Sequence, residues 1–194
     1  PGPKTAVFID EAMHCSPDFE SNGLKPVNSA MYFKSLADFF SVFEEKTGLR
    51  VVIAAHPESD PEFLRNALGK RPVYQGKILE LIAGCECVFA HWSTAVSFPV
   101  LCKKPLLLLN NQAIKETSLE YILVNMAASL GVPVLDLDDK MALQAFNFDH
   151  TSWPMAGYEN YKYSFVLRKD APELPSWRIM ADAILNRYYN VSWL

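Results

Sequence analysis

Residues 86–109 read ECVFAHWSTAVSFPVLCKKPLLLL, and this stretch predicts the unit around which the chain is organised. The pattern is that of a buried strand (87–90), a polar tip (91–94), a short helix and a second buried strand (106–109). In an open α/β sheet, such a unit places the amides of a helix start beside the carboxyl end of a parallel strand, where these sheets bind ligands. These amides and the Ser93 and Thr94 hydroxyls could bind a phosphate there, or the hydroxyls could merely cap the helix.

Strands and helices alternate along the rest of the chain. We expect strands at residues 5–9, 50–55, 72–74 and 133–137, and helices at 28–47, 61–68, 77–83, 117–131 and 175–189. Residues 117–120 (TSLE) match a capping box, residues 12–27 read as a long loop, and residues 138–170 show no sustained period. This order predicts one α/β domain over residues 1–194, a Rossmann-like doubly wound, mostly parallel sheet with helices on both faces.

The composition is that of an ordinary soluble globular protein. Of 194 residues, 50% are hydrophobic and 21% are charged, with a formal net charge of −4. The acidic balance argues against broad electrostatic binding to nucleic acid, so no nucleic-acid partner is expected. No apolar run approaches the roughly 20 residues that span a bilayer, and the N-terminus has no secretory pattern. We therefore expect a cytoplasmic protein without a transmembrane segment, although the full protein could associate peripherally with a membrane.

The cysteines fit reduced residues of a hydrophobic core. Cys85 and Cys87 lie on or beside one predicted strand, Cys102 on an apolar helix, and Cys15 in the early loop. The Cys85-Glu86-Cys87 sequence lacks the two-residue gap and the second half of a zinc knuckle. No metal and no cofactor are therefore expected.

Three predicted strands end in polar residues. The first runs into Asp10-Glu11, the second into His56-Pro57, and the third into residues 91–94. Each tip alone has a plain structural explanation, such as a solvated turn or a helix cap. Because the carboxyl ends of parallel strands meet at one edge of a sheet, we expect all three tips to lie together and to form a ligand site.

Such a set of side chains suits glycosyl transfer from a nucleotide-activated sugar. The departing phosphate needs hydrogen-bond donors, which His56, Ser93 and Thr94 could supply without a metal. The acceptor hydroxyl needs a base, and either Asp10 or Glu11 qualifies. The chain lacks Gly-x-Gly-x-x-Gly, a Walker loop and Gly-x-Ser-x-Gly, which argues against a dehydrogenase, a P-loop NTPase and an α/β-hydrolase. Further candidates for substrate binding are His14, Pro57, Lys77 and His91.

The same residues carry a resemblance to known enzymes. Asp10-Glu11-Ala12, His56-Pro57 and Ser93-Thr94 resemble the three short motifs of bacterial sialyltransferases and related capsule transferases, which use CMP-activated sugars. Over most of residues 5–110 the chain also resembles bacterial surface-polysaccharide glycosyltransferase-like proteins of GT-B architecture. The segments that carry this wider resemblance are VFID (7–10), YFKSL (32–36), AAHP (54–57), HWST (91–94) and Lys104-Pro105.

The resemblance implies a role for each motif. Asp10 would be the base with Glu11 as the alternative, His56 would meet the nucleotide phosphate, and Ser93 with Thr94 would bind phosphate beside it. The sialyltransferases have glycine where this chain has Ala12, so the choice between the two carboxylates stays open. The partners implied are a nucleotide-sugar, with CMP ahead of UDP, and a saccharide acceptor on a surface polysaccharide.

GT-B enzymes close two Rossmann-like domains over a cleft, and the resemblance implies that this chain is the nucleotide-binding, C-terminal half. Because a strand begins within five residues of a start without Met, we expect a piece of a larger protein. The final helix would then pack toward the missing half and leave apolar surface exposed here. Two alternatives remain: a nucleotide-sugar epimerase or hydrolase on the same fold, and a non-catalytic module that binds nucleotide-sugar or polysaccharide.

Overall fold

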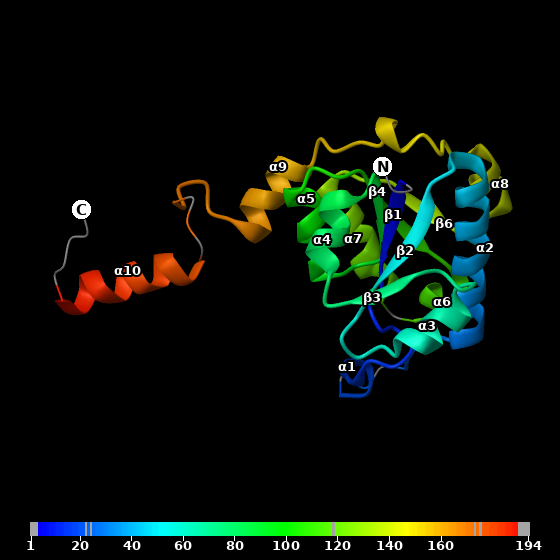
Figure 1. The fold of residues 1–194 in the computed structure, drawn as a ribbon, viewed down its shortest axis with the longest axis horizontal. Helices are drawn as coiled ribbons and strands as arrows, with labels where there is room; N and C mark the ends of the chain where they lie inside the picture. The colour runs from blue at the N-terminus through cyan, green and yellow to red at the C-terminus, as the bar shows by residue number, and fades with distance from the viewer. Residues whose placement is uncertain are drawn as a thin grey trace.

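A parallel sheet forms the centre of the molecule. Its strands are β1 (Thr5–Ile9), β2 (Arg50–Ala55), β3 (Val73–Gln75), β4 (Cys87–Ala90), β5 (Leu106–Asn110) and β6 (Val134–Asp136). The computed structural model describes residues 4–21, 23, 25–117, 119–172, 174 and 176–189, and in these the strand order is β3-β2-β1-β4-β5-β6 (Figure 1). All neighbouring strands are parallel, which confirms the predicted doubly wound fold. Since the order reverses between β1 and β4, the ligand crevice of such a sheet is expected outside their carboxyl ends.

Both faces of the sheet are buried under helices. In β1, Ala6 and Phe8 belong to one hydrophobic core and Val7 and Ile9 to the other, as the two-residue period of a strand requires. One face carries α2 (Ser29–Thr47), α3 (Pro61–Ala67), α6 (Gln112–Lys115) and α8 (Lys140–Ala145), and the other carries α4 (Ile78–Gly84), α5 (Ser97–Leu101), α7 (Glu120–Leu130) and α9 (Tyr158–Tyr161). All four cysteines are free, and Cys85 and Cys87 are buried in these cores.

Helix α2 is the largest element on its face, and its bounds follow from local chemistry. The Asn28 side chain accepts a hydrogen bond from the Met31 amide at the start of the helix, and Gly48 adopts the left-handed conformation that ends it. The buried face of the helix packs its phenylalanines against Phe89 of β4, with Phe43 in an edge-to-face contact at 4.8 Å between ring centroids. The predicted helix is confirmed.

Two local predictions are wrong. Helix α7 begins at Glu120, and Thr117 is not its cap, because the Thr117 hydroxyl donates to the Ile114 carbonyl and accepts from the Leu119 amide. The hydroxyl therefore closes the turn after α6, a helix that the apolar pattern did not indicate. The expected loop over residues 12–27 also contains a short helix, α1 (Pro17–Ser21).

The C-terminal part of the chain crosses back over the sheet and then leaves it. After η2 (His150–Ser152), α9 packs against α7, and η3 (Lys162–Val166) follows. Helix α10 (Ser176–Tyr189) then projects away from the body (Figure 1). Its residues Trp177, Met180 and Ile184 are 66%, 63% and 50% exposed, so the expected exposed apolar surface is present. Among the helices that the structure describes, none has the length and apolar character needed to cross a membrane.

Candidate functional site

The carboxylate of Asp10 joins the end of β1 to the end of β2. One of its oxygens accepts a hydrogen bond from the His56 amide at 3.0 Å, and the other accepts from the Ala12 amide at 3.3 Å. The side chain is buried, since Asp10 is only 3% exposed. Ala12 has a φ of 51°, in the left-handed region that favours glycine. The sialyltransferase motif has glycine at the position of Ala12, and the backbone conformation found at Ala12 is one that glycine adopts easily.

The carboxylate of Glu11 joins the end of β1 to the end of β4. Its two oxygens accept from the amides of His91 at 2.8 Å and Trp92 at 3.1 Å. This contact lies where the strand order reverses. Burial raises the pKa of Glu11 to about 8; the two amide bonds oppose this rise and the charge of Asp10 adds to it.

The two carboxylates leave β1 in opposite directions, toward different neighbouring strands. Through them, the three strand tips form one hydrogen-bonded cluster. Asp10 bonds His56, which lies 46 residues further along the chain, and Glu11 bonds His91, which lies 80 residues further along. The expectation that these tips meet at one edge of the sheet is confirmed. Both acidic side chains also have a structural task, which the sequence did not reveal.

His56 lies at the rim of the cluster with a partly exposed side chain. Its Nδ1 accepts from the Glu58 amide at 3.2 Å, so the neutral ring carries its proton on Nε2. Among the residues that the structure describes, Nε2 has no hydrogen-bond partner, and the side chain is 39% exposed. The exposed Pro57 occupies the turn that follows, which the Ser59 amide closes by donating to the His56 carbonyl at 3.0 Å. The Glu58 carboxylate also lies 3.8 Å from Nδ1, so both polar contacts of the ring within the described residues are at this nitrogen, and Nε2 is the donor left for a ligand.

Ser93 and Thr94 lie at the start of η1 (Thr94–Val96), directly after the β4 tip. The Ser93 hydroxyl oxygen accepts from the Ala95 amide at 3.1 Å, and the Val96 amide donates to the Ser93 carbonyl at 3.1 Å. Ser93 therefore does cap this helix start, and both of these amides are already in use. The exposed Thr94 hydroxyl and the proton of the Ser93 hydroxyl remain for a ligand, so the expectation that the amides bind phosphate is weakened.

The His91 side chain is buried behind the rim. Its Nδ1 lies 2.6 Å from the Leu109 carbonyl oxygen, and its Nε2 lies 2.9 Å from the Tyr32 hydroxyl. Both ring nitrogens are therefore occupied, and burial lowers the pKa of His91 to about 4, which keeps the ring neutral. The structure gives His91 a supporting place under the β4 tip. It also adds Tyr32, which the sequence analysis included only in the YFKSL segment of the wider resemblance.

The remaining candidates, His14 and Lys77, follow strands β1 and β3 at the same edge of the sheet. The His14 ring stacks on Phe63 with 4.9 Å between centroids, and burial lowers its pKa. Its Nδ1 is buried and has no hydrogen-bond partner within the described part of the chain. Lys77 is exposed in the turn after β3. A groove of about 420 Å³ opens between residues 23 and 25–28 on one side and α6 with the turn after it on the other.

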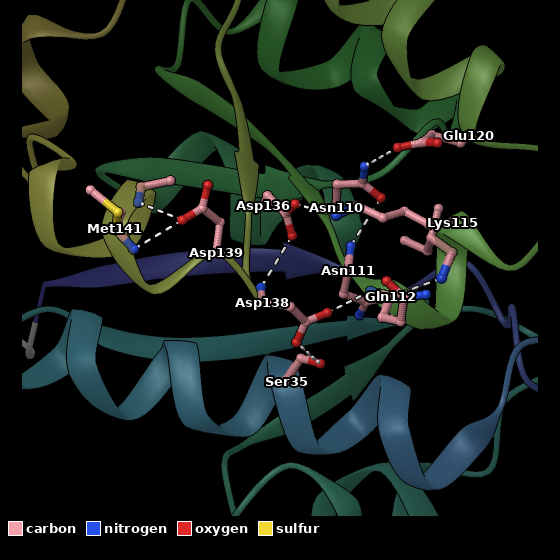
Figure 2. A network of polar contacts seen from close by, with 12 residues as sticks. Ser35, Asn110, Asn111, Gln112, Lys115, Glu120, Asp136, Asp138, Asp139 and Met141 are labelled. Atoms are coloured by element: carbon pink, nitrogen blue, oxygen red, sulfur yellow. Dashed lines mark hydrogen bonds and ion pairs between the residues drawn. The ribbon is translucent and has the colours of Figure 1, made fainter.

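A second polar network stiffens the same edge of the sheet at β5 and β6 (Figure 2). The Lys115 ammonium pairs with Asp136, and the Asp136 carboxylate also accepts from the Asp138 amide. Sequence reasoning missed this network, although the Asn110-Asn111 pair directly follows a buried strand. The linked residues are Ser35, Asn110, Gln112, Lys115, Glu120, Asp136 and Asp138.

Comparison with known proteins gives a likeness of fold. No protein-family model matches the chain, and no curated protein sequence matches it. Spinosyn rhamnosyltransferase SpnG complexed with thymidine diphosphate matches with 15% identity and a TM-score of 0.42, over 84% of this chain and 37% of that one. The UDP-GlcNAc 2-epimerase of Methanocaldococcus jannaschii, in complex with UDP-GlcNAc and UDP, matches with 10% identity and a TM-score of 0.45, over 84% and 44%.

A third solved structure, the glycosyltransferase SnogD from Streptomyces nogalater, matches with 14% identity and a TM-score of 0.38, over 82% of this chain and 43% of that one. The chain thus spans less than half the length of each of these proteins. A likeness at this level concerns the fold alone.

Proposed function

We propose that this chain is the nucleotide-sugar-binding half of a glycosyltransferase, which transfers a sugar from a CMP-linked donor to a surface polysaccharide. The observation that carries the proposal is the bonded cluster at the carboxyl ends of β1, β2 and β4. Asp10 bonds the His56 amide, and Glu11 bonds the amides of His91 and Trp92. These bonds hold the acidic motif next to the His-Pro motif and next to residues 91 and 92, which directly precede the Ser-Thr pair. This arrangement supports one site at the crevice where doubly wound sheets bind ligands.

The donor phosphate would bind at His56. Its side chain is partly exposed, its Nε2 has no partner among the described residues, and a hydrogen bond to a phosphate oxygen is charge-assisted. The hydroxyls of Ser93 and Thr94 would add two neutral donors from the β4 side. These donors would stabilise the negative charge that develops on the phosphate as the sugar leaves.

Glu11 suits the role of general base better than Asp10. Both carboxylates use their two oxygens on loop amides, but Asp10 is almost fully buried, whereas Glu11 is partly exposed. A pKa of about 8 also places Glu11 near the value at which a base works best at neutral pH. In the proposed reaction, Glu11 takes the proton of the acceptor hydroxyl, the acceptor oxygen bonds to the sugar carbon, and the bond from that carbon to the phosphate oxygen breaks to release CMP.

The proposal predicts a preference among nucleotides that thermal unfolding can measure. CMP at about 100 times its dissociation constant should stabilise the fold by about 2.7 kcal/mol, and UDP, GDP and ADP at the same concentration should stabilise it less. No group of three His, Cys, Asp or Glu residues in the described part of the chain could hold a metal, so EDTA should leave the CMP effect unchanged. Loss of the effect with EDTA and its return with magnesium would contradict this phosphate site.

The same nucleotides separate the alternative functions. An epimerase or hydrolase would act on a CMP-sugar without any acceptor, and a hydrolase would release free CMP from it. A binding module would take up the nucleotide-sugar and leave it intact, even with a saccharide acceptor present. Release of CMP only when an acceptor is added is the result expected for a transferase.

A further inference from the structure

We infer that Gln75 is a positioning residue for His56, an inference that rests on the proposed role of His56 in phosphate binding. Gln75 is the last residue of β3, and it stands beside Ala55, the last residue of β2, in the sheet register. Its side-chain amide therefore reaches the turn that carries His56. None of the motifs in the sequence includes this glutamine.

The Gln75 amide binds three carbonyl groups of one turn. Its Nε2 lies 2.9 Å from the His56 oxygen, 3.0 Å from the Pro57 oxygen and 3.3 Å from the Ser59 oxygen. Carbonyl oxygens only accept hydrogen bonds, so these contacts fix the orientation of the amide with its nitrogen toward the turn. Residues 56–59 are thereby tied to β3 by one side chain.

The His56 peptide is consequently held from several sides. Its amide donates to Asp10, and its carbonyl accepts from Gln75 and from the Ser59 amide. Its ring Nδ1 accepts from the Glu58 amide, which belongs to the same turn. The tautomer with the proton on Nε2 therefore depends on the shape of the turn, and that shape depends on Gln75.

A ring held in one tautomer is the arrangement that phosphate binding at Nε2 needs. If the Glu58 amide turned away, Nδ1 would be free to carry the proton, and Nε2 would become an acceptor that repels phosphate oxygens. Gln75 would thus act on the ligand through His56 without contacting it. Supporting residues of this kind set the orientation and protonation of a binding group.

The test is the Gln75→Met variant, which keeps the length of the side chain and removes its donors. In ligand-free protein with 15N-labelled histidine, at about pH 8 where free imidazole is neutral, the His56 ring signals are identified by their loss in His56→Ala. We expect the Nε2–H tautomer in the wild type and a mixture of tautomers in Gln75→Met. Gln144→Met, which alters a surface glutamine on α8, should match the wild type.

A second measurement shows whether the effect passes through His56. Gln75→Met should weaken CMP binding about three- to tenfold, the scale of one lost hydrogen bond, but should have no further effect in His56→Ala. Equal weakening in both backgrounds would overturn the inference, and so would an unchanged ring tautomer in Gln75→Met. If the wild type does not bind CMP, the proposed function is wrong. The tautomer of the His56 ring in Gln75→Met still shows whether Gln75 positions His56.

Discussion

Glu11→Gln in the full-length protein should lower turnover by about 10²-fold or more, the scale of a lost general base, while changing the affinity for CMP much less. Glutamine keeps the size of the side chain and one oxygen that can accept from the His91 or Trp92 amide, but it cannot take a proton. Steady-state kinetics with a CMP-sugar donor and a saccharide acceptor measure the turnover. Thermal unfolding of the variant shows how far the lost second acceptor loosens the β4 tip.

The pH dependence provides a further check on this variant. Glu11 has to be ionised to act as a base, and its pKa is raised to about 8. The kcat/KM of the wild type should therefore rise with pH and level off above about 8, and this rise should be absent from the residual activity of Glu11→Gln.

Asp10→Asn is the matched control. It removes the negative charge next to Glu11 and alters the bond to the His56 amide, so it should weaken CMP binding more than it slows turnover. If Asp10→Asn abolished transfer at unchanged affinity while Glu11→Gln stayed active, the base would be Asp10. If both variants kept full activity, neither carboxylate would take part in the chemistry, and their only task would be to hold the loops.

Gly157→Ala should strongly destabilise the fold. A Cβ atom at Gly157 would lie 2.1 Å from the Leu130 carbonyl oxygen and 2.4 Å from its carbon, and neither backbone atom can move without disturbing the end of α7. We expect a loss at the upper end of the range of about 1–3 kcal/mol that overpacking costs, or more. Urea unfolding measures this loss as a lower midpoint.

Gly84→Ala is the control for this stability effect. Gly84 is the last residue of α4, its φ is not positive, and a Cβ atom there would meet nothing within 4 Å. The control should unfold at or slightly above the wild-type midpoint, because alanine favours the helix. Equal midpoints for the two variants would show that α9 does not pack tightly on α7.

The sequence predicted most of the sheet because the strands are buried on both faces and therefore read as short apolar runs. Leu106 to Leu109 and Val51 to Ile53 have that form. The polar residues after the strands at 5–9, 50–55 and 87–90 were predicted to meet at one edge of the sheet, and they do. Thr117 misled the prediction because its hydroxyl bonds locally to the preceding turn, which a four-residue motif does not distinguish from a helix cap.

The site was harder to predict because the partners of its side chains lie far away in the sequence. His91 follows a strand like His56 does, but its ring turns inward to Tyr32, 59 residues away in the sequence. Gln75 binds a turn that lies 16 to 19 residues before it, and no local pattern marks it. Such partners become visible only when the strands are placed side by side.

A calorimetric titration of CMP into the wild type, His56→Ala and His150→Ala tests the central claim most directly. His150 belongs to η2 and lies near Glu86, which precedes β4 and so is at the opposite end of the sheet, and its removal should leave CMP binding unchanged. If the strand tips bind the donor phosphate, His56→Ala should weaken binding by about 1–3 kcal/mol, or roughly 5- to 150-fold. An identical dissociation constant for the wild type and His56→Ala, or no CMP binding by the wild type, would contradict the claim.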